Sequence, residues 1–208
     1  MKLHLPPEER DVLQWAFTEI YFHDCYGLGT LSQAPATILD VGGNVGFFSM
    51  VARHHYPHAT IHCYEPNRAL SSALEAHLAP FNVRVFLEGV GLRAGRVRLE
   101  LRGGSLHSVT KEAAGGDVVL TSFATAVDRI GNQVDLLKLD CEGAEWEILQ
   151  DAASLRRVKM LTMEYHLWAR PGSSVQDLEA LLARHGFMIT HHQPIDGATW
   201  GLMWAQKR

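Results

Sequence analysis

The chain has 208 residues, 47% hydrophobic and 20% charged, which is enough to bury the core of one globular domain. A formal net charge of -4 excludes the basic excess that is typical of nucleic-acid-binding domains. The sequence has no apolar run of membrane-spanning length, and residues 1–10 lack the apolar stretch of a signal peptide. Three cysteines without paired spacing predict free thiols. We therefore expect a cytoplasmic protein without nucleic-acid or membrane partners.

The first half of the chain alternates between helical and strand periodicity. Helical spacing of apolar residues predicts a first helix over Glu8–Phe22. The next elements, in order, are a strand at Thr37–Val41, a helix at Gly46–His55, a strand at Thr60–Tyr64, a helix at Asn67–Leu78 and a strand at Val83–Val90.

The second half begins with an excursion and ends with a hairpin. We expect a half-exposed strand at Arg96–Leu101, and mobile loops at Gly103–Gly116 and Ala169–Ser174. The last two strands have no room for a helix between them, so they form an antiparallel hairpin. The elements are strands at Asp117–Thr121, Val134–Leu139, Lys159–Tyr165, Phe187–His191 and Trp200–Ala205, and helices at Ser122–Ile130, Gly143–Gln150 and Ser174–His185.

Repeated strand–helix units predict an α/β fold, with a mostly parallel seven-stranded sheet, helices on both faces and a terminal antiparallel hairpin. We expect residues 1–30 to form a helical cap and residues 31–208 to form one folding unit that binds the cofactor.

The turn after the first strand is the most informative segment. Glycines let the backbone approach a ligand closely, and Asn44 is a residue that tolerates left-handed geometry. Ligands of open α/β sheets bind at this carboxyl edge. We expect cofactor contacts from Asp40, Gly42, Gly43, Asn44, Gly46 and Phe47.

The charge of this turn indicates which cofactor it serves. Asp40 precedes Gly42 by two residues, and Asn44 stands where a dinucleotide fingerprint has its second glycine. A carboxylate opposes a pyrophosphate by roughly 4 kcal/mol at contact and an effective dielectric of about 20. The turn therefore favours S-adenosylmethionine, which carries an ammonium and a sulfonium, and disfavours a nicotinamide oxidoreductase.

The ends of the next two strands predict the rest of the cofactor site. Glu65 ends the second strand about twenty residues after the turn, where an acidic side chain accepts hydrogen bonds from ribose hydroxyls. Pro66 helps to end that strand. We expect the adenine near Glu88, Gly89 and Val90.

The segment Val134–Glu145 resembles the D-x-x-K-x-D-x-E-G-x-E signature of the FkbM-type methyltransferases. Its order and spacing relative to Asp40–Gly46, Tyr64–Asn67 and Met163–His166 are similar to that family, and the resemblance covers roughly Glu19–Gly186. It implies a Rossmann-like class I methyltransferase fold, S-adenosylmethionine, and O-methylation of a sugar or secondary metabolite. An N-methyltransferase and a non-catalytic cofactor-binding protein are the alternatives.

Three residues at strand ends are candidates for catalysis. Asp140 is placed to hold the methionine ammonium or to touch the substrate hydroxyl. Glu164 and His166 share one face of their strand, and a histidine has an ordinary pKa near 6.5 that suits a general base. Glu164 either orients His166 or is itself the base.

Lys138 lies in an apolar strand, so we expect a carboxylate partner, Asp40 or Asp135. Glu145 is expected to complement the start of a helix.

Two further expectations concern ligands. Asp140, Glu142, Glu164 and His166 would suit a hard divalent metal ion, although no spacing requires one. Aromatic side chains suit the ring of a small-molecule substrate. The candidate substrate contacts are Tyr21, Tyr26, His107, Glu142 and Trp168.

Overall fold

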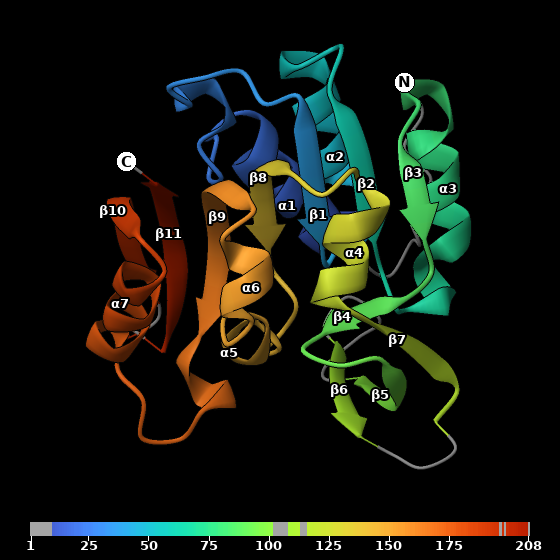
Figure 1. Ribbon diagram of the computed structural model, residues 1–208. Helices are drawn as coiled ribbons and strands as arrows, with labels where there is room; N and C mark the ends of the chain where they lie inside the picture. The colour runs from blue at the N-terminus through green and yellow to red at the C-terminus, as the bar shows by residue number, and fades with distance from the viewer. Residues whose placement is uncertain (1–9, 102–107, 113–115, 196, 198, 208) are drawn as a thin grey trace.

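The large sheet of the computed structural model has seven strands in the order β10-β11-β9-β8-β1-β2-β3 (Figure 1). The structure describes residues 10–101, 108–112, 116–195, 197 and 199–207. Strands β3, β2, β1, β8 and β9 run parallel, and the last two strands add an antiparallel hairpin, as the sequence predicts. The bounds are Thr37–Val41 (β1), Thr60–Tyr64 (β2), Arg84–Phe86 (β3), Val134–Leu139 (β8), Val158–His166 (β9), Phe187–Ile195 (β10) and Trp200–Lys207 (β11).

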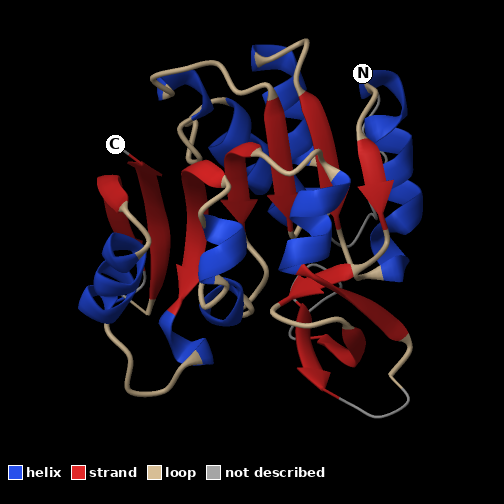
Figure 2. Ribbon diagram, in the orientation of Figure 1, coloured by secondary structure: helices blue, strands red, loops and turns tan. Residues whose placement is uncertain are grey.

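Helices cover both faces of this sheet, which confirms the expected layers (Figure 2). Alternate residues of one strand point to opposite faces, so Leu39 packs in the core beneath α4 to α7, whereas Ile38 packs beneath α2. The helices are Arg10–Tyr21 (α1), Phe47–His55 (α2), Ser71–Leu78 (α3), Phe123–Arg129 (α4), Glu145–Ile148 (α5), Ala152–Leu155 (α6) and Val175–Arg184 (α7), with short 3-10 turns at Leu28–Thr30 (η2), Arg68–Leu70 (η3), Ala79–Phe81 (η4) and Leu167–Ala169 (η5).

A second sheet of four strands departs from the prediction. The expected single strand Val83–Val90 is wrong, because it divides into β3 and β4 (Gly89–Gly91), which belong to different sheets. Between them Glu88 turns outward to pair with Arg129 at 2.7 Å, and Gly89 and Gly91 let the chain pass close to Leu120. The order is β4-β7-β5-β6, with β5 at Gly95–Leu101, β6 at Ser108–Glu112 and β7 at Val118–Ser122.

Other elements differ in extent. The helix expected at Gly143–Gln150 covers only Glu145–Ile148, and Asp151 then caps the separate helix α6. Strand β6 lies within the expected loop Gly103–Gly116. The three cysteines are free thiols, as predicted. Within the described residues, no helix is both long and apolar enough to cross a membrane.

The N-terminal segment packs closely on the rest of the chain. Helix α1 contacts α2, and the ring of Phe17 lies edge-on to that of Phe47 at 5.3 Å between centroids. Trp204 of β11 donates a hydrogen bond of 3.0 Å to the carbonyl of Cys25. The division into a cap over residues 1–30 and a domain over residues 31–208 stays a prediction.

Candidate active site

A cavity of about 540 Å³ opens where β1, β2, β8 and β9 end. This is the carboxyl edge at which open α/β sheets bind their ligands. Its walls come from the turn after β1, the end of β2, the second sheet, the ends of β8 and β9, helix α1 and the terminal hairpin. Five carboxylates line it, those of Glu19, Glu65, Asp140, Glu142 and Glu164.

The turn after β1 brings the backbone to the cavity wall. Gly42 has a φ of 84°, and a Cβ there would lie 1.6 Å from the carbonyl oxygen of Asp140, so the two strand ends can meet only at a glycine. Asn44 adopts a left-handed φ of 51°. Both residues line the cavity together with Gly43 and Phe47. Gly46 begins α2 instead, against Leu78, and is not among the lining residues.

Glu65 fastens this turn to the end of β2. Its carboxylate accepts hydrogen bonds from the backbone amides of Asn44 at 2.8 Å and Asn67 at 2.7 Å. Burial raises the pKa of Glu65 to about 7, although both amide bonds oppose the shift. The carboxylate is thus held against the cavity wall, beside Pro66, Gly89 and Val90. Glu88 is not a lining residue.

Asp40 and Lys138 form a buried pair beneath the cavity. Nζ of Lys138 lies 3.3 Å from Oδ1 of Asp40, and Ser49 donates a 2.6 Å hydrogen bond to the other oxygen of Asp40. Burial opposes the charge of Lys138, but Asp40 and Asp140 outweigh it and raise the lysine pKa. The predicted partner is confirmed as Asp40, whereas Asp135 pairs with Lys159 at 2.7 Å.

Asp40, which the sequence predicts to face the cofactor, is buried in this pair. Asp40 is 0% exposed and is not a lining residue, so its charge is neutralised by Lys138 rather than directed at a ligand. The negative potential of the cavity comes instead from the lining carboxylates. Among the lining residues of the described chain, Lys138 is the one lysine or arginine, and it also donates a hydrogen bond to the carbonyl of Gly42. The cavity therefore still favours a cationic ligand.

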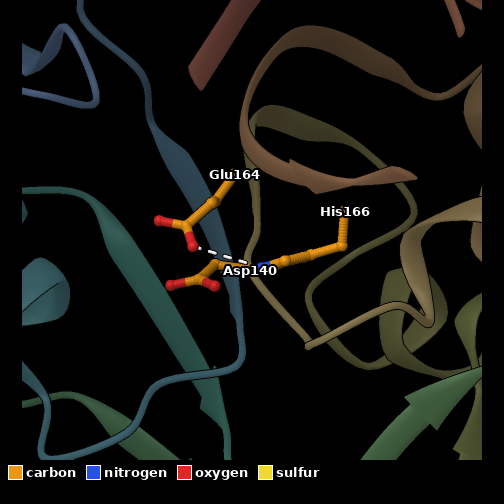
Figure 3. A group of neighbouring side chains, drawn as sticks. All are labelled: Asp140, Glu164 and His166. Carbon is orange, nitrogen blue, oxygen red and sulfur yellow. Dashed lines mark hydrogen bonds and ion pairs between the residues drawn. The ribbon is translucent and has the colours of Figure 1, made fainter. Parts of the chain in front are cut away.

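Asp140, Glu164 and His166 converge at the ends of β8 and β9 (Figure 3). Nε2 of His166 lies 3.2 Å from Oε1 of Glu164 and 3.9 Å from Glu142, while its Nδ1 lies 3.3 Å from Oε1 of Glu145. Burial opposes a charge on the imidazole, but the hydrogen bonds to Glu145 and Glu164 outweigh it and raise the pKa of His166 to about 11. His166 is therefore an imidazolium at neutral pH.

The same surroundings shift the pKa of Glu164 toward neutrality. Burial and the charge of Asp140 raise the pKa of Glu164 to about 7, against the lowering effect of its hydrogen bond to His166. A carboxylate with such a pKa is well matched to accept a proton near pH 7.

Glu145 has a role that sequence reasoning missed. Its carboxylate accepts hydrogen bonds from the backbone amides of Cys141 at 2.8 Å and Gly143 at 2.9 Å, in addition to its contact with His166. It thus ties the turn after β8 to the end of β9. The sequence shows the acidic residues of segment 140–145, but it does not show the contact between Glu145 and His166 of β9.

The predicted substrate contacts are only partly brought together. Tyr26, Glu142 and Trp168 line the cavity, and the hydroxyl of Tyr26 donates a 2.9 Å hydrogen bond to Asp140. Tyr21 is not a lining residue, and His107 lies outside the described residues. Sequence reasoning missed several lining side chains that arrive through tertiary packing, namely Trp15 and Glu19 from α1 and Gln193 and Trp200 from the terminal hairpin.

The cluster at Asp140 has the residue types of a metal site, since one ligand atom each of Asp140, Glu164 and His166 lies within 4.8 Å of the others. Several of its ligand atoms already contact protein groups, however. Oδ2 of Asp140 accepts from Tyr26 and lies 3.5 Å from Nζ of Lys138. Both ring nitrogens of His166 face carboxylates. This pattern favours a protonated imidazole over a metal ligand.

Residues 40–189 match the model of the methyltransferase FkbM domain. The chain is 28% identical to methyltransferase sdnD of Sordaria araneosa, over 90% of this chain and 85% of that protein. It is 26% identical to 31-O-demethyl-FK506 methyltransferase FkbM of Streptomyces tacrolimicus, over 86% and 84%. It is also 25% identical to AMB antimetabolite synthetase AmbE of Pseudomonas aeruginosa, of which it spans only 11%.

Solved structures support the fold. Methyltransferase FkbM of Methylobacillus flagellatus superposes with a TM-score of 0.61 at 15% identity, covering 91% of this chain and 47% of that one. Magnesium protoporphyrin IX methyltransferase of Synechocystis, solved with bound S-adenosylmethionine, has a TM-score of 0.59 at 9% identity, covering 100% and 87%. The architecture is therefore that of class I methyltransferases.

Proposed function

The chain belongs to the FkbM family of S-adenosylmethionine-dependent methyltransferases, and we propose that it methylates a hydroxyl group of a sugar or secondary metabolite. The observation that carries this proposal is that one cavity is lined both by the glycine turn after β1 and by the cluster of Asp140, Glu164 and His166. A donor bound at the turn and an acceptor beside the cluster would share a single space, as a direct transfer requires.

Donor binding follows from the residues on the β1 side of the cavity. Glu65 would accept hydrogen bonds from the ribose hydroxyls, because its carboxylate is already held in place by two backbone amides. The adenine would lie against Gly89 and Val90 of the second sheet. Asp140, kept in place by Tyr26 and Lys138, would face the ammonium group of the donor. When bound, S-adenosylmethionine supplies an electrophilic methyl group on a positively charged sulfur.

We assign the proton acceptor to Glu164 rather than to His166. An imidazolium has no free lone pair, so His166 cannot accept a proton until it loses its own. Glu164 has a pKa near neutrality, lines the cavity, and is oriented by the imidazolium 3.2 Å away. In this account Glu164 takes the hydroxyl proton of the acceptor, and His166 stabilises the cluster as a fixed cation.

The relatives motivate the acceptor class. One is named for O-demethyl-FK506, and others are methyltransferases with no acceptor in their names. Aromatic side chains of Tyr26, Trp168 and Trp200 border the cavity and suit the apolar faces of ring compounds. The proposal routes no step through a metal ion, because both ring nitrogens of His166 already face carboxylates.

The test is methyl transfer from tritiated S-adenosylmethionine to a panel of hydroxylated glycosides and macrolides, with matched primary amines as the second arm. Incorporation into the hydroxyl compounds, with the methyl group located on oxygen by mass spectrometry, is the expected result. Transfer confined to the amines would replace the proposal with N-methylation.

A further inference from the structure

Helix α1 presents two side chains of complementary chemistry to the cavity. Trp15 and Glu19 are one helical turn apart, so they lie on the same face of α1, and both line the cavity. Trp15 is nevertheless 58% exposed, whereas tryptophan side chains are mostly buried in folded proteins. An exposed indole at the edge of a binding cavity offers a flat apolar face to a ligand.

The helix that carries this pair is held firmly. Leu13 is 1% exposed in the core beneath α1, and Phe17 packs edge-on against Phe47 of α2. Glu19 is itself oriented, since Nδ1 of His23 lies 2.9 Å from its Oε1. The helix thus holds the backbone of both residues in place, and the carboxylate of Glu19 is oriented by His23.

We propose that Trp15 and Glu19 form an acceptor subsite that holds an uncharged, hydroxyl-bearing ring. This inference rests on the proposed function. It adds the two residues that hold the acceptor and a preference for uncharged acceptors. The indole would cover the apolar face of the ring, and the carboxylate would accept a hydrogen bond from a ring hydroxyl.

The charges around the subsite select against anions. Five lining residues are carboxylates, while Lys138 is fully engaged by Asp40, Asp140 and the carbonyl of Gly42. His166 is enclosed by Glu145 and Glu164. Among the described lining residues, a phosphate or carboxylate on the acceptor would meet negative charge without an available cation, so a phosphorylated or carboxylated analogue should be a poor substrate.

The test compares a neutral methyl glycoside and a macrolide with their carboxylated analogues as acceptors, using tritiated S-adenosylmethionine. We expect the neutral rings to be methylated and the anionic analogues to react at least tenfold less efficiently. In W15A and E19Q the KM of the neutral acceptor should rise at least tenfold, with donor affinity unchanged, and W15F should recover most of the W15A loss.

Two controls keep the test specific. Phe22 is 69% exposed at the end of the same helix without lining the cavity, so F22A should leave the acceptor KM unchanged. E75Q on α3 is the matched control for E19Q. An unchanged KM in W15A, a loss of donor affinity in place of acceptor affinity, or equal use of anionic analogues would overturn the subsite. Failure of the wild-type protein to bind S-adenosylmethionine would instead contradict the proposed function.

Discussion

The hydroxyl of Tyr26 donates a 2.9 Å hydrogen bond to Oδ2 of Asp140, across 114 positions of sequence. Below this bond Nζ of Lys138 lies 5.6 Å from the centre of the Tyr26 ring and 3.5 Å from Asp140. The segment that follows α1 therefore belongs to the wall of the cavity. Its Tyr26 holds Asp140, the residue that we propose faces the ammonium group of the donor.

Removing Lys138 should destabilise the protein strongly. In K138M the carboxylate of Asp40 stays buried without its counter-ion, which costs about 3–5 kcal/mol in comparable buried pairs. The double variant K138M/D40N should recover much of that loss, because the fully buried charge of Asp40 is removed with its counter-ion, while Asp140 stays partly exposed to solvent. Urea unfolding of the two single variants and the double variant measures the coupling, and simple additivity of the two effects would contradict a direct pair.

Activity should rise with pH through the pKa of Glu164. Since the carboxylate form accepts the proton and its pKa is raised to about 7, kcat/KM should increase as pH rises from 6 to 8 and then level off. E164Q should lower kcat by about 10²–10⁴-fold, as loss of a general base does, and should abolish this rise. The same pH profile in E164Q and the wild type would remove Glu164 from the role.

H166Q separates the two candidate bases. Losing the imidazolium removes a charge that lowers the pKa of Glu164, so the rise in kcat/KM should persist but move to higher pH. Disappearance of the rise in H166Q, with its retention in E164Q, would return the base role to His166.

The pH dependence of the unfolding free energy should reveal the charge of His166 independently of enzyme activity. Its pKa in the folded protein, about 11, lies above the ordinary value of 6.5, so its stabilising contribution is complete below pH 6.5 and declines as pH rises toward 11. The gap in unfolding free energy between the wild type and H166Q should therefore narrow between pH 6.5 and 9. A gap that widens over this range would contradict an imidazolium.

Chelation of metal ions should leave turnover unchanged. Oδ2 of Asp140 and both ring nitrogens of His166 already contact protein groups, and the proposed proton transfer to Glu164 involves no metal ion. Assays after dialysis against EDTA measure this directly, and activity that is lost on dialysis and restored by Mg²⁺ would contradict it.

The sequence predicts the large sheet, and it predicts that the glycine turn and the end of the second strand line the cavity, because these signals are local. A buried strand, a glycine turn and an acidic residue at the next strand end are readable one segment at a time, as at Gly42 and Glu65. The division of Val83–Val90 between two sheets depends on packing against Leu120, which periodicity does not reveal.

The rest of the cavity wall is less predictable because it is assembled over long sequence distances. Asp40 looked like a ligand contact from its position, but its burial against Lys138 is a property of two strands lying side by side. Trp15 and Trp200 reach one cavity from opposite ends of the chain. One partner of His166, Glu145, likewise comes from the turn after β8, and together with Glu164 it raises the pKa of His166.

The most direct measurement of the central claim is calorimetric titration of S-adenosylmethionine into the wild type, E65A and the exposed-helix control E75A. An acidic cavity with Glu65 at its wall predicts binding to the wild type and E75A, and at least a tenfold higher Kd in E65A, or about 1.4 kcal/mol. NAD should not bind, because its diphosphate would meet carboxylates, and the described lining residues offer no free cation. Tight binding of NAD without binding of S-adenosylmethionine would contradict the account.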